Sequence, residues 1–342
     1  MSPRGILILG VLTLVTLTLA LILGRPTGPV NTFDSEPLVP GLREMVNDID
    51  AIVVTAADGV AVASLQRDRE RWLVAEKDGY EADFELVQGL LRELASGRRL
   101  EPRTSNEAWH ARLGVADLSV EDSAGLHLSF PGSDLPTLII GNLDPTETGR
   151  FVRLLGDPQA WLSDRRLDIP TSVLRWLQRA VMDIPARELA EVTLRHADGD
   201  TVILRAASED GDDWVLMNVP DGRQAAEMWQ LRPVANGLAN VDLDGVRRHD
   251  QVPDEAVRAL YVTRDGLNFV ASLFEDDDGR WVHFSVSAEV QADGDDETEL
   301  PSIVTDAAAV DARLSGWQFR LPQRKYENMT RRLEDLLRPE EA

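Results

Sequence analysis

The stretch that decides the fold is Ile49-Asp50-Ala51-Ile52-Val53-Val54, followed by Ala57-Asp58-Gly59, the apolar run Val60–Leu65, and Arg71-Trp72-Leu73-Val74. The pattern recurs as Leu189-Ala190-Glu191-Val192-Thr193-Leu194, Ala197-Asp198-Gly199, Thr201–Leu204 and Asp213-Trp214-Val215-Leu216. Asp-Gly supplies the positive φ that a two-residue hairpin turn requires. Each stretch therefore predicts strand, tight turn, strand, loop and strand. The tryptophan is expected in the core, with a ligand-binding aromatic as the alternative.

A helix is expected after the third strand of each copy. In the first copy the apolar residues recur at spacings of three and four, which is typical of one helix face: Phe84, Val87, Leu90, Leu91 and Leu94. The matching segment of the second copy is Ala225–Leu238, which Pro233 disturbs. Further strands follow in both copies. Near their ends stand Gly149-Arg150-Phe151-Val152 and Gly279-Arg280-Trp281-Val282, in the same order.

These patterns predict an α+β protein in which an N-terminal transmembrane helix precedes two similar units of antiparallel sheet plus helix. The first unit covers 46–168 and the second 187–322. Pro170 and the apolar spacing of Val173, Leu174, Leu177 and Val181 favour a connecting helix over 169–186. The shared face of Tyr326, Met329, Leu333 and Leu336 predicts a C-terminal amphipathic helix over 323–342.

The N-terminal segment reads as a membrane anchor. Residues 5–24 are GILILGVLTLVTLTLALILG, without a charge, and twenty residues of helix span about 30 Å of bilayer. We assign 1–24 to the anchor and 25–45 to an extended linker. A cleaved signal peptide is the competing interpretation, although Gly24-Arg25-Pro26 is a poor cleavage site. We expect a single-pass protein of the bacterial inner membrane, with its N-terminus in the cytoplasm and its bulk periplasmic or otherwise extracytoplasmic.

Composition excludes several classes of function. The 342 residues carry a net charge of −24, and such a surface repels phosphate backbones, so nucleic acid is not an expected partner. The chain has no cysteine. Disulfides, thiolate catalysis, zinc ribbons and a lipoprotein anchor are therefore excluded.

Chemical motifs are few. The sequence has no P-loop, dinucleotide-binding glycine motif, nucleophile elbow or HExxH. None of the five histidines stands at metal-ligand spacing from another, and the acidic runs read as solvated loops. We therefore expect no catalytic residue, cofactor or metal. Arg150 and Arg280 are the candidate contacts with a ligand or partner, because an arginine repeated in both copies can bind a carboxylate or a backbone carbonyl. A structural ion pair is the alternative for both.

The chain resembles a known bacterial family. The matching pieces are Trp72-Leu73-Val74, Leu113-Gly114-Val115, Ile139-Ile140-Gly141, Gly149-Arg150-Phe151-Val152, Trp161-Leu162, Asp183-Ile184-Pro185 and Trp317-Gln318-Phe319-Arg320. They are similar to N-terminally anchored proteins that carry a domain of unknown function and are encoded beside an ABC-type exporter permease and a gliding-motility-like auxiliary protein. The resemblance implies partners among the permease and auxiliary subunits of an ABC-type exporter, and it brings no catalytic residue.

Three functions remain open. The first is a non-enzymatic extracytoplasmic accessory subunit of an ABC-type transporter or cell-envelope complex, which contacts the bilayer through residues 5–24. The second is a ligand-binding module that uses a groove between the two units. The third is an envelope hydrolase, which requires acidic residues that converge in a concave pocket with raised pKa values.

Overall fold

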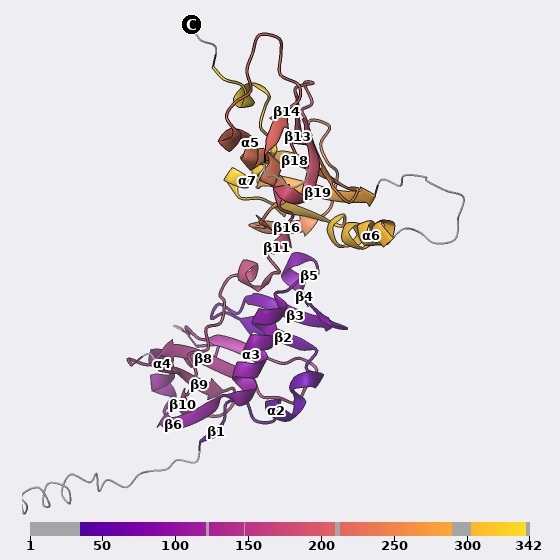
Figure 1. The fold of residues 1–342 in the computed structure, drawn as a ribbon. Coiled ribbons are helices and arrows are strands. Elements are labelled where there is room, and N and C mark those ends of the chain that lie inside the picture. Colours follow the sequence, from indigo (N-terminus) through magenta and orange to yellow (C-terminus); the bar gives the residue numbers. More distant parts are fainter. Residues whose placement is uncertain (1–34, 121–122, 147, 209–212, 289–301, 340–342) are drawn as a thin grey trace, which may run out of the picture.

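The structure is a computed structural model that describes residues 35–120, 123–146, 148–208, 213–288 and 302–339 (Figure 1). The membrane helix predicted over 5–24 lies outside these residues. Within the described ranges, no helix combines the length and apolar character needed to cross a bilayer. Antiparallel sheets with a few helices make up these ranges, as expected for an α+β protein.

The first unit is built on an antiparallel sheet of ten strands in the described residues, in the order β1-β6-β10-β9-β8-β7-β2-β3-β4-β5. Its strands are β1 (Glu36–Pro37), β2 (Ala51–Thr55), β3 (Ala61–Asp68), β4 (Arg71–Val74), β5 (Tyr80–Glu81), β6 (Arg98–Thr104), β7 (Leu126–Ser129), β8 (Leu138–Leu143), β9 (Arg150–Leu154) and β10 (Ala160–Ser163).

The second unit is built on a sheet in the order β14-β13-β12-β17-β18-β19-β20-β16. Its strands are β12 (Leu189–Arg195), β13 (Thr201–Ala206), β14 (Trp214–Leu216), β16 (Gly245–Arg248), β17 (Val257–Thr263), β18 (Leu267–Asp276), β19 (Gly279–Ala288) and β20 (Trp317–Arg320). Read in reverse, this order is the order of β6 to β4 in the first sheet, with every strand replaced by its counterpart in the second copy. The two sheets therefore share one topology.

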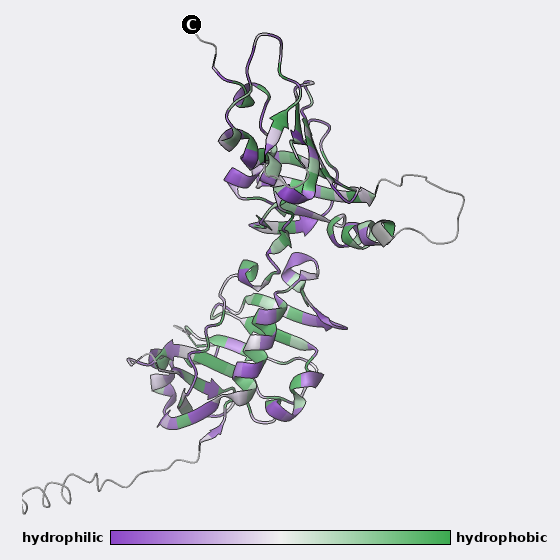
Figure 2. Ribbon diagram, in the orientation of Figure 1, coloured by the Kyte–Doolittle hydropathy of each residue, from purple (hydrophilic) through white to green (hydrophobic). Residues whose placement is uncertain are grey.

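Short helices cover these sheets. They are α2 (Leu42–Met45), α3 (Phe84–Ser96), α4 (His110–Leu113), α5 (Met228–Ala235), α6 (Ser302–Leu314) and α7 (Gln323–Met329). Single 3₁₀ turns lie at Val46–Asp48, Ala75–Lys77, Glu107–Trp109, Val173–Trp176, Ala186–Glu188, Asn236–Leu238 and Glu334–Leu336. In α3 the Asp83 side chain caps the N-terminus by accepting a hydrogen bond from the Leu86 amide at 3.0 Å. The predicted apolar face of α3 is buried from Val87 to Leu94. Hydrophobic residues gather on the strands of both units (Figure 2).

The two Asp-Gly hairpins have the same geometry. The Ala56 amide donates to the Val60 carbonyl at 2.9 Å, and the His196 amide donates to the Asp200 carbonyl at 2.9 Å. Each loop therefore has three residues rather than the two expected. The last of the three is Gly59 in one copy and Gly199 in the other, at φ of 78° and 92°. A glycine in the left-handed region closes this type of hairpin without steric cost.

The connecting helix predicted over 169–186 is wrong. The segment instead forms the turn 173–176, the short strand β11 (Ala180–Met182) and the turn 186–188. Trp176 is fully buried, and Leu177 is extended and bridges Ala82 of the first unit. β11 then pairs with β15 (Val241–Asp242) of the second unit. These tertiary hydrogen bonds hold the backbone in an extended form, although the apolar spacing also suits a helix.

Two further boundaries are corrected. The linker predicted over 25–45 is too long at its C-terminal end, because β1 and α2 belong to the first unit and Leu38 and Leu42 are fully buried. Residues 25–34 lie outside the described residues. The C-terminal helix predicted over 323–342 ends at Met329. Between Met329 and residue 339, where the described residues end, the helical structure is the turn 334–336, and Leu336 and Leu337 are buried in the core.

The two units lie end to end and meet where β5, β11 and β16 come together (Figure 1). Tyr80 packs edge-on against Trp317, with 5.0 Å between ring centroids. Arg248 stacks over the same Trp317 at 4.0 Å and donates to the Asp78 carbonyl at 2.8 Å. The Tyr80 hydroxyl donates to the Gln178 carbonyl at 3.1 Å, so aromatic packing and hydrogen bonds both join the units.

Candidate functional site

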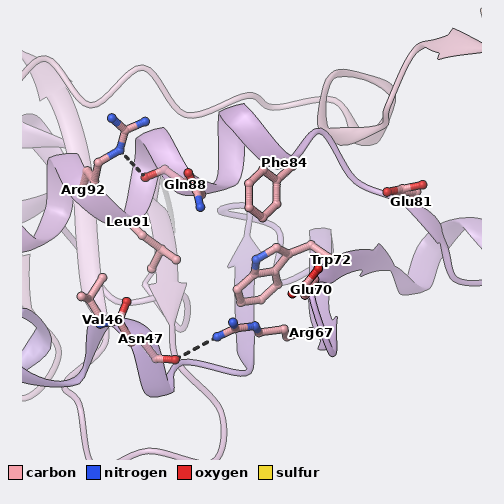
Figure 3. Close-up of a pocket in the computed structure, with 10 residues that line it drawn as sticks. All are labelled: Val46, Asn47, Arg67, Glu70, Trp72, Glu81, Phe84, Gln88, Leu91 and Arg92. Carbon is pink, nitrogen blue, oxygen red and sulfur yellow. Dashed lines mark hydrogen bonds between the residues drawn. The ribbon is translucent and has the colours of Figure 1, made fainter.

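A pocket lies between α3 and the outer strands of the first sheet, and we call it the α3 pocket (Figure 3). Its volume is about 620 Å³, within the range of roughly 300–1,000 Å³ common for ligand sites. It is lined by Val46, Asn47, Arg67, Glu70, Trp72, Glu81, Phe84, Gln88, Leu91 and Arg92. Helix α3 contributes four of these residues, from Phe84 to Arg92.

The floor of the α3 pocket is apolar. Trp72 and Leu91 are 4% and 6% exposed, and both belong to the core of the first unit. Phe84 is 44% exposed, because it is the first residue of α3 and lies outside the buried face of the helix. An exposed phenylalanine beside a buried tryptophan gives an apolar surface on which a flat or branched group can pack.

Two arginines border this floor. Arg67 donates to the Asn47 carbonyl at 2.8 Å and to the Arg69 carbonyl at 3.0 Å. Arg92 donates to the Gln88 carbonyl at 3.3 Å. In the part of the chain that the structure describes, neither guanidinium forms an ion pair with a carboxylate. Because a guanidinium has five N–H donors, each retains donors that these bonds do not use, although the Arg92 side chain points away from Trp72 and Arg67 (Figure 3).

The two acidic residues of the pocket lie apart from each other. Glu81 of β5 lies at the end away from Arg92, and Glu70 lies beside Arg67 and Trp72 (Figure 3). The backbone carbonyl of Glu81 accepts a hydrogen bond from the Gln178 amide at 2.9 Å, which fixes the strand that carries its side chain. The charged residues of the pocket are therefore mixed around its apolar floor, with Glu70 beside Arg67 and with Arg92 and Glu81 at opposite ends (Figure 3).

The corresponding place in the second unit has different residues and hydrogen bonds. Trp214 pairs with Ala206 on the neighbouring strand, as Trp72 pairs with Arg67, so an alanine replaces that arginine. The Trp214 amide donates to the Met228 sulfur at 3.4 Å. Asn236, which follows α5 where Arg92 stands in α3, accepts a hydrogen bond from the Ala186 amide at 3.3 Å. This bond joins the end of the helix to the entry of the unit, and the first unit has no such bond among its described residues.

Arg150 and Arg280 occupy equivalent places at the starts of β9 and β19, but the structure does not bring them together. Arg150 donates to the carbonyls of Arg166 at 2.6 Å and Gly141 at 2.9 Å. Arg280 lies 3.3 Å from the Glu275 carboxylate on the neighbouring strand. Neither arginine lines the α3 pocket.

The repeated Gly-Arg pair has a structural role that the sequence reasoning missed. The Asp144 carboxylate accepts a hydrogen bond from the Gly149 amide at 3.0 Å, and Asp276 accepts one from the Gly279 amide at 3.1 Å. A Cβ on Gly149 would stand 2.0 Å from the Ser163 carbonyl oxygen, so the backbone approach requires glycine. The signal available in the sequence was an aspartate that precedes each Gly-Arg pair by a few residues.

Hydrogen bonds stabilise the ionised form of both aspartates. Hydrogen bonds from the Thr146 hydroxyl and then from the Gly149 amide lower the pKa of Asp144 to about 2. Burial acts in the opposite direction on Asp276, but hydrogen bonds from Arg247, the Asp278 amide and Trp281 together lower its pKa. Both groups hold their hairpins by accepting hydrogen bonds in the charged form.

Other groups of polar side chains lie outside the α3 pocket. The rings of His249 and His283 stack with 3.8 Å between centroids, and burial, followed by the charge of His283, lowers the pKa of His249. Two histidines 34 positions apart gave no sequence signal for this contact. Within the described residues, no group of three or more His, Asp or Glu side chains is placed to hold a metal ion. A cavity at the junction of the units measures about 270 Å³ and includes Tyr80 and Trp317 in its lining.

A model of the protein family described as a domain of unknown function (DUF4340) matches residues 72–260. No curated protein and no solved structure matches the chain. The family match begins at Trp72 in the floor of the α3 pocket, crosses the junction, and ends in β17 of the second unit. Because it covers more than half of the 342 residues, the chain belongs to the DUF4340 family.

Proposed function

We propose that the protein is a non-enzymatic, extracytoplasmic accessory subunit of an ABC-type transporter or cell-envelope complex. In this proposal residues 5–24 anchor it in the bacterial inner membrane, and the two units bind a permease or auxiliary subunit. The genomic company of the family that the sequence resembles suggests this class of partner. The proposal is about binding, so it depends on a surface that suits a partner.

The observation that carries the proposal is the α3 pocket. It is open, has an aromatic floor with Phe84 partly exposed, and is bordered by two arginines without carboxylate partners in the described residues. Exposed aromatic residues and arginines are enriched where proteins bind one another. The packed junction supports the same function, because the Tyr80–Trp317 contact limits independent movement of the units and presents the pocket at a fixed place relative to the second unit.

The carboxyl groups with shifted pKa values favour binding over hydrolysis. In the described residues these groups are Asp144, Asp198, Asp276 and Glu334, and every one of these pKa values is lowered. A general acid needs a raised pKa instead. All four groups accept structural hydrogen bonds, and none of them lines the α3 pocket.

The test is purification of the tagged full-length chain from its own cells after mild detergent solubilisation. We expect permease or auxiliary subunits of a transporter to be recovered with it at defined stoichiometry, before and after crosslinking in intact cells. Recovery of the chain alone under both conditions would contradict the proposal. A chain found free in the cytosol would contradict the anchored arrangement.

A second candidate is a ligand-binding module. The volume of the α3 pocket, about 620 Å³, favours it because cavities of this size bury most of a small molecule. The site differs from the groove between the units that the sequence suggested, since the α3 pocket belongs to the first unit. Recovery of a small organic molecule with the purified chain, without any protein, would favour this candidate over the accessory subunit.

A further inference from the structure

The sheet of the second unit has one face turned away from the core. In β12 the side chains of Val192 and Leu194 are buried in the core, and the alternation of a strand turns Thr193 and Arg195 to the opposite side. Helices α5, α6 and α7 bury residues in the same core, so they cover the other side of the sheet. We call the side that carries Thr193 and Arg195 the outer face.

A row of apolar side chains crosses the outer face. Direct pairing joins Ile203 to Thr193, Thr193 to Leu260, and Leu260 to Val270. Met217 continues the row, since its amide donates to the Ile203 carbonyl at 2.8 Å, and it is 48% exposed. Ile203, Leu260 and Val270 are partly exposed, and within the described ranges none of the three packs against a buried core cluster. The row is therefore apolar surface that these parts of the chain leave open.

Two arginines stand directly opposite each other beside this row. Arg195 of β12 pairs with Arg258 of β17, and both residues are exposed. In the part of the chain that the structure describes, neither guanidinium forms an ion pair or a hydrogen bond, although Asp254 and Glu255 precede β17. Like charges directly opposite on adjacent strands destabilise a sheet. A carboxylate from outside the chain would relieve this repulsion by accepting hydrogen bonds from both guanidinium groups.

Other acidic side chains near the pair are bound elsewhere. On the outer face, the Glu191 carboxylate accepts hydrogen bonds from the Arg205 guanidinium at 2.8 and 3.2 Å. At the end of the hairpin, Asp198 and Asp200 lie 2.8 and 3.6 Å from the guanidinium of Arg332. The positive charge of the pair is therefore not matched by these three carboxylates.

The first unit shows that the topology does not require the apolar row. Ser64 and Ser129 both pair with Val53 on the equivalent strand of the first sheet. They occupy the positions that Ile203 and Leu260 occupy in the second sheet. The same pattern of strands therefore forms with polar residues at these positions.

The arginine pair is also specific to the second unit. Thr55 pairs with His127 at the equivalent position of the first sheet. His127 is 6% exposed, with its Nε2 3.3 Å from the Ala116 carbonyl oxygen, so a loop covers this place. In the second unit the same position carries two exposed positive charges. The difference favours a role in binding, because the fold forms without an arginine at either position.

We propose that the outer face of the second sheet binds a partner protein, with apolar side chains of the partner over the row from Met217 to Val270 and a partner carboxylate between Arg195 and Arg258. This inference rests on the proposed accessory function, because it names the surface by which the second unit holds a subunit. A protein surface offers apolar side chains beside carboxylates. A polyanionic polymer would match the arginines alone, and the net charge of −24 would repel it.

The direct test is photocrosslinking in intact cells that produce the full-length chain. Benzoylphenylalanine replaces Leu260 in one variant and Ser129, the equivalent residue of the first unit, in the matched control. We expect the Leu260 variant to capture a permease or auxiliary subunit through a peptide that contains Asp or Glu, and the control to capture none. Equal capture at both positions, or capture only of a second copy of the chain or of an envelope polymer at Leu260, would overturn the inference.

Variants test the two parts of the surface. The double variant Arg195→Ala/Arg258→Ala should lower recovery of the partner subunit about tenfold, because its carboxylate loses both guanidinium groups. Leu260→Ser gives the second sheet the residue of the first and should also weaken recovery. The matched control is Arg324→Ala/Arg331→Ala, which removes two exposed arginines of the second unit and changes the net charge equally. Losses no greater than those of the control would contradict the proposed surface.

Arg195→Thr separates binding from support of the fold. Thr55 is the equivalent residue of the first unit, and threonine suits a strand without repelling Arg258. We expect the urea midpoint of unfolding to rise while recovery of the subunit falls. If the midpoint falls together with recovery, Arg195 supports the fold and the inference is overturned. Unchanged recovery would overturn it as well.

Purification distinguishes this inference from the function on which it rests. If the wild type and the Arg195→Ala/Arg258→Ala variant recover the same transporter subunits equally, the accessory function stands and the outer-face inference is overturned. If the wild type recovers no transporter subunit, the accessory function fails. The inference then stands only if Leu260 crosslinks another identified envelope protein, and if exchanging the charges of both arginines and of the partner carboxylate restores a contact that either change alone removes. Any other result overturns both.

Discussion

The two units share a topology but use it differently. Both bury a tryptophan on the third strand beneath a helix, Trp72 in one and Trp214 in the other. In the first unit this helix borders the α3 pocket, whereas in the second the Asn236–Ala186 hydrogen bond joins the end of the helix to the entry of the unit. The comparison teaches that the core specifies the fold, while a few rim positions decide whether the fold offers a binding site.

The correspondence extends to the segments that end each unit. The Trp176 carbonyl accepts from the Asp83 amide at 2.8 Å, and the Leu336 carbonyl accepts from the Ala226 amide at 2.8 Å. The isolated bridges Ala82–Leu177 and Ala225–Leu337 follow at the next residues. Residues 336–337 therefore pair with the second unit in the way that residues 176–177 pair with the first. After residue 177 the chain continues into β11.

The largest effect should come from truncating these closing residues. Trp176→Ala removes a fully buried ring whose Nε1 donates to the Pro170 carbonyl at 3.2 Å, and we expect a loss of about 4 kcal/mol in the free energy of unfolding. Leu336→Ala should cost about 3 kcal/mol for the same reason. Urea unfolding followed by tryptophan fluorescence and circular dichroism checks both. A cost below about 1 kcal/mol for Leu336→Ala would break the correspondence.

A smaller loss should follow overpacking at Gly237 of the second unit. A Cβ there would stand 2.0 Å from the hydroxyl of Tyr261, which is fully buried. We expect Gly237→Ala to cost about 2 kcal/mol, measured by the same unfolding experiment. The control is Gly89→Ala in the interior of α3, where a Cβ meets nothing within 4 Å. It should instead stabilise the protein by roughly 0.5–1 kcal/mol. Equal effects at both sites would contradict the packing described for the second unit.

Acid should weaken the hairpin that Asp144 holds. Its pKa is lowered to about 2 in the folded protein, below the unfolded value of about 4. A lowered folded pKa contributes stability that is complete above the unfolded value and is lost as the pH falls through about 2. Urea midpoints from pH 6 to pH 2 should therefore fall less steeply for Asp144→Asn than for the wild type. The exposed Asp254→Asn serves as a control, and an unchanged slope in Asp144→Asn would count against the hydrogen-bonded carboxylate.

The smallest effect on stability is expected at the rim of the α3 pocket. Arg92→Asn gives the first unit the residue found at this place in the second, and Arg92 is exposed, with its guanidinium hydrogen-bonded to the Gln88 carbonyl. We expect the free energy of unfolding to change by less than about 0.5 kcal/mol, measured in urea. A loss above about 1 kcal/mol would indicate that Arg92 supports the fold rather than a ligand.

The parts of the fold that the sequence predicted correctly have strong local sequence patterns, such as turn residues and apolar periodicity. Asp58-Gly59 and Asp198-Gly199 fixed the hairpins, although both loops have three residues because the flanking residues pair across the turn. The stripe from Val87 to Leu94 predicted α3. The helix predicted over 169–186 was wrong because the apolar spacing of this segment is compatible with both a helical and an extended backbone. The contacts of Trp176 with Pro170 and of Leu177 with Ala82 chose the extended one.

The candidate site was less accessible from sequence. Arg150 and Arg280 were conspicuous because they repeat, but Arg150 bonds to the carbonyls of Gly141 and Arg166, and Arg280 pairs with the Glu275 carboxylate. Arg67 and Arg92 do not repeat, and they are 25 positions apart on a strand and a helix. Only the packing of α3 against the turn 46–48 and the outer strands brings them to one pocket. The repeat therefore drew attention to Arg150 and Arg280, which have structural contacts. It gave no indication of Arg67 and Arg92, which line the pocket.

The sequence by itself determined the α+β class, the two copies of one strand-and-helix pattern, and the residues that form their cores. It could do so because turns and apolar periodicity act over a few neighbouring residues. Only the tertiary structure decided which hydrogen bonds each helix makes at its end, and where the chain crosses between the two copies. Those outcomes depend on contacts between distant residues, such as Asn236 with Ala186 and Tyr80 with Trp317, which no local pattern encodes.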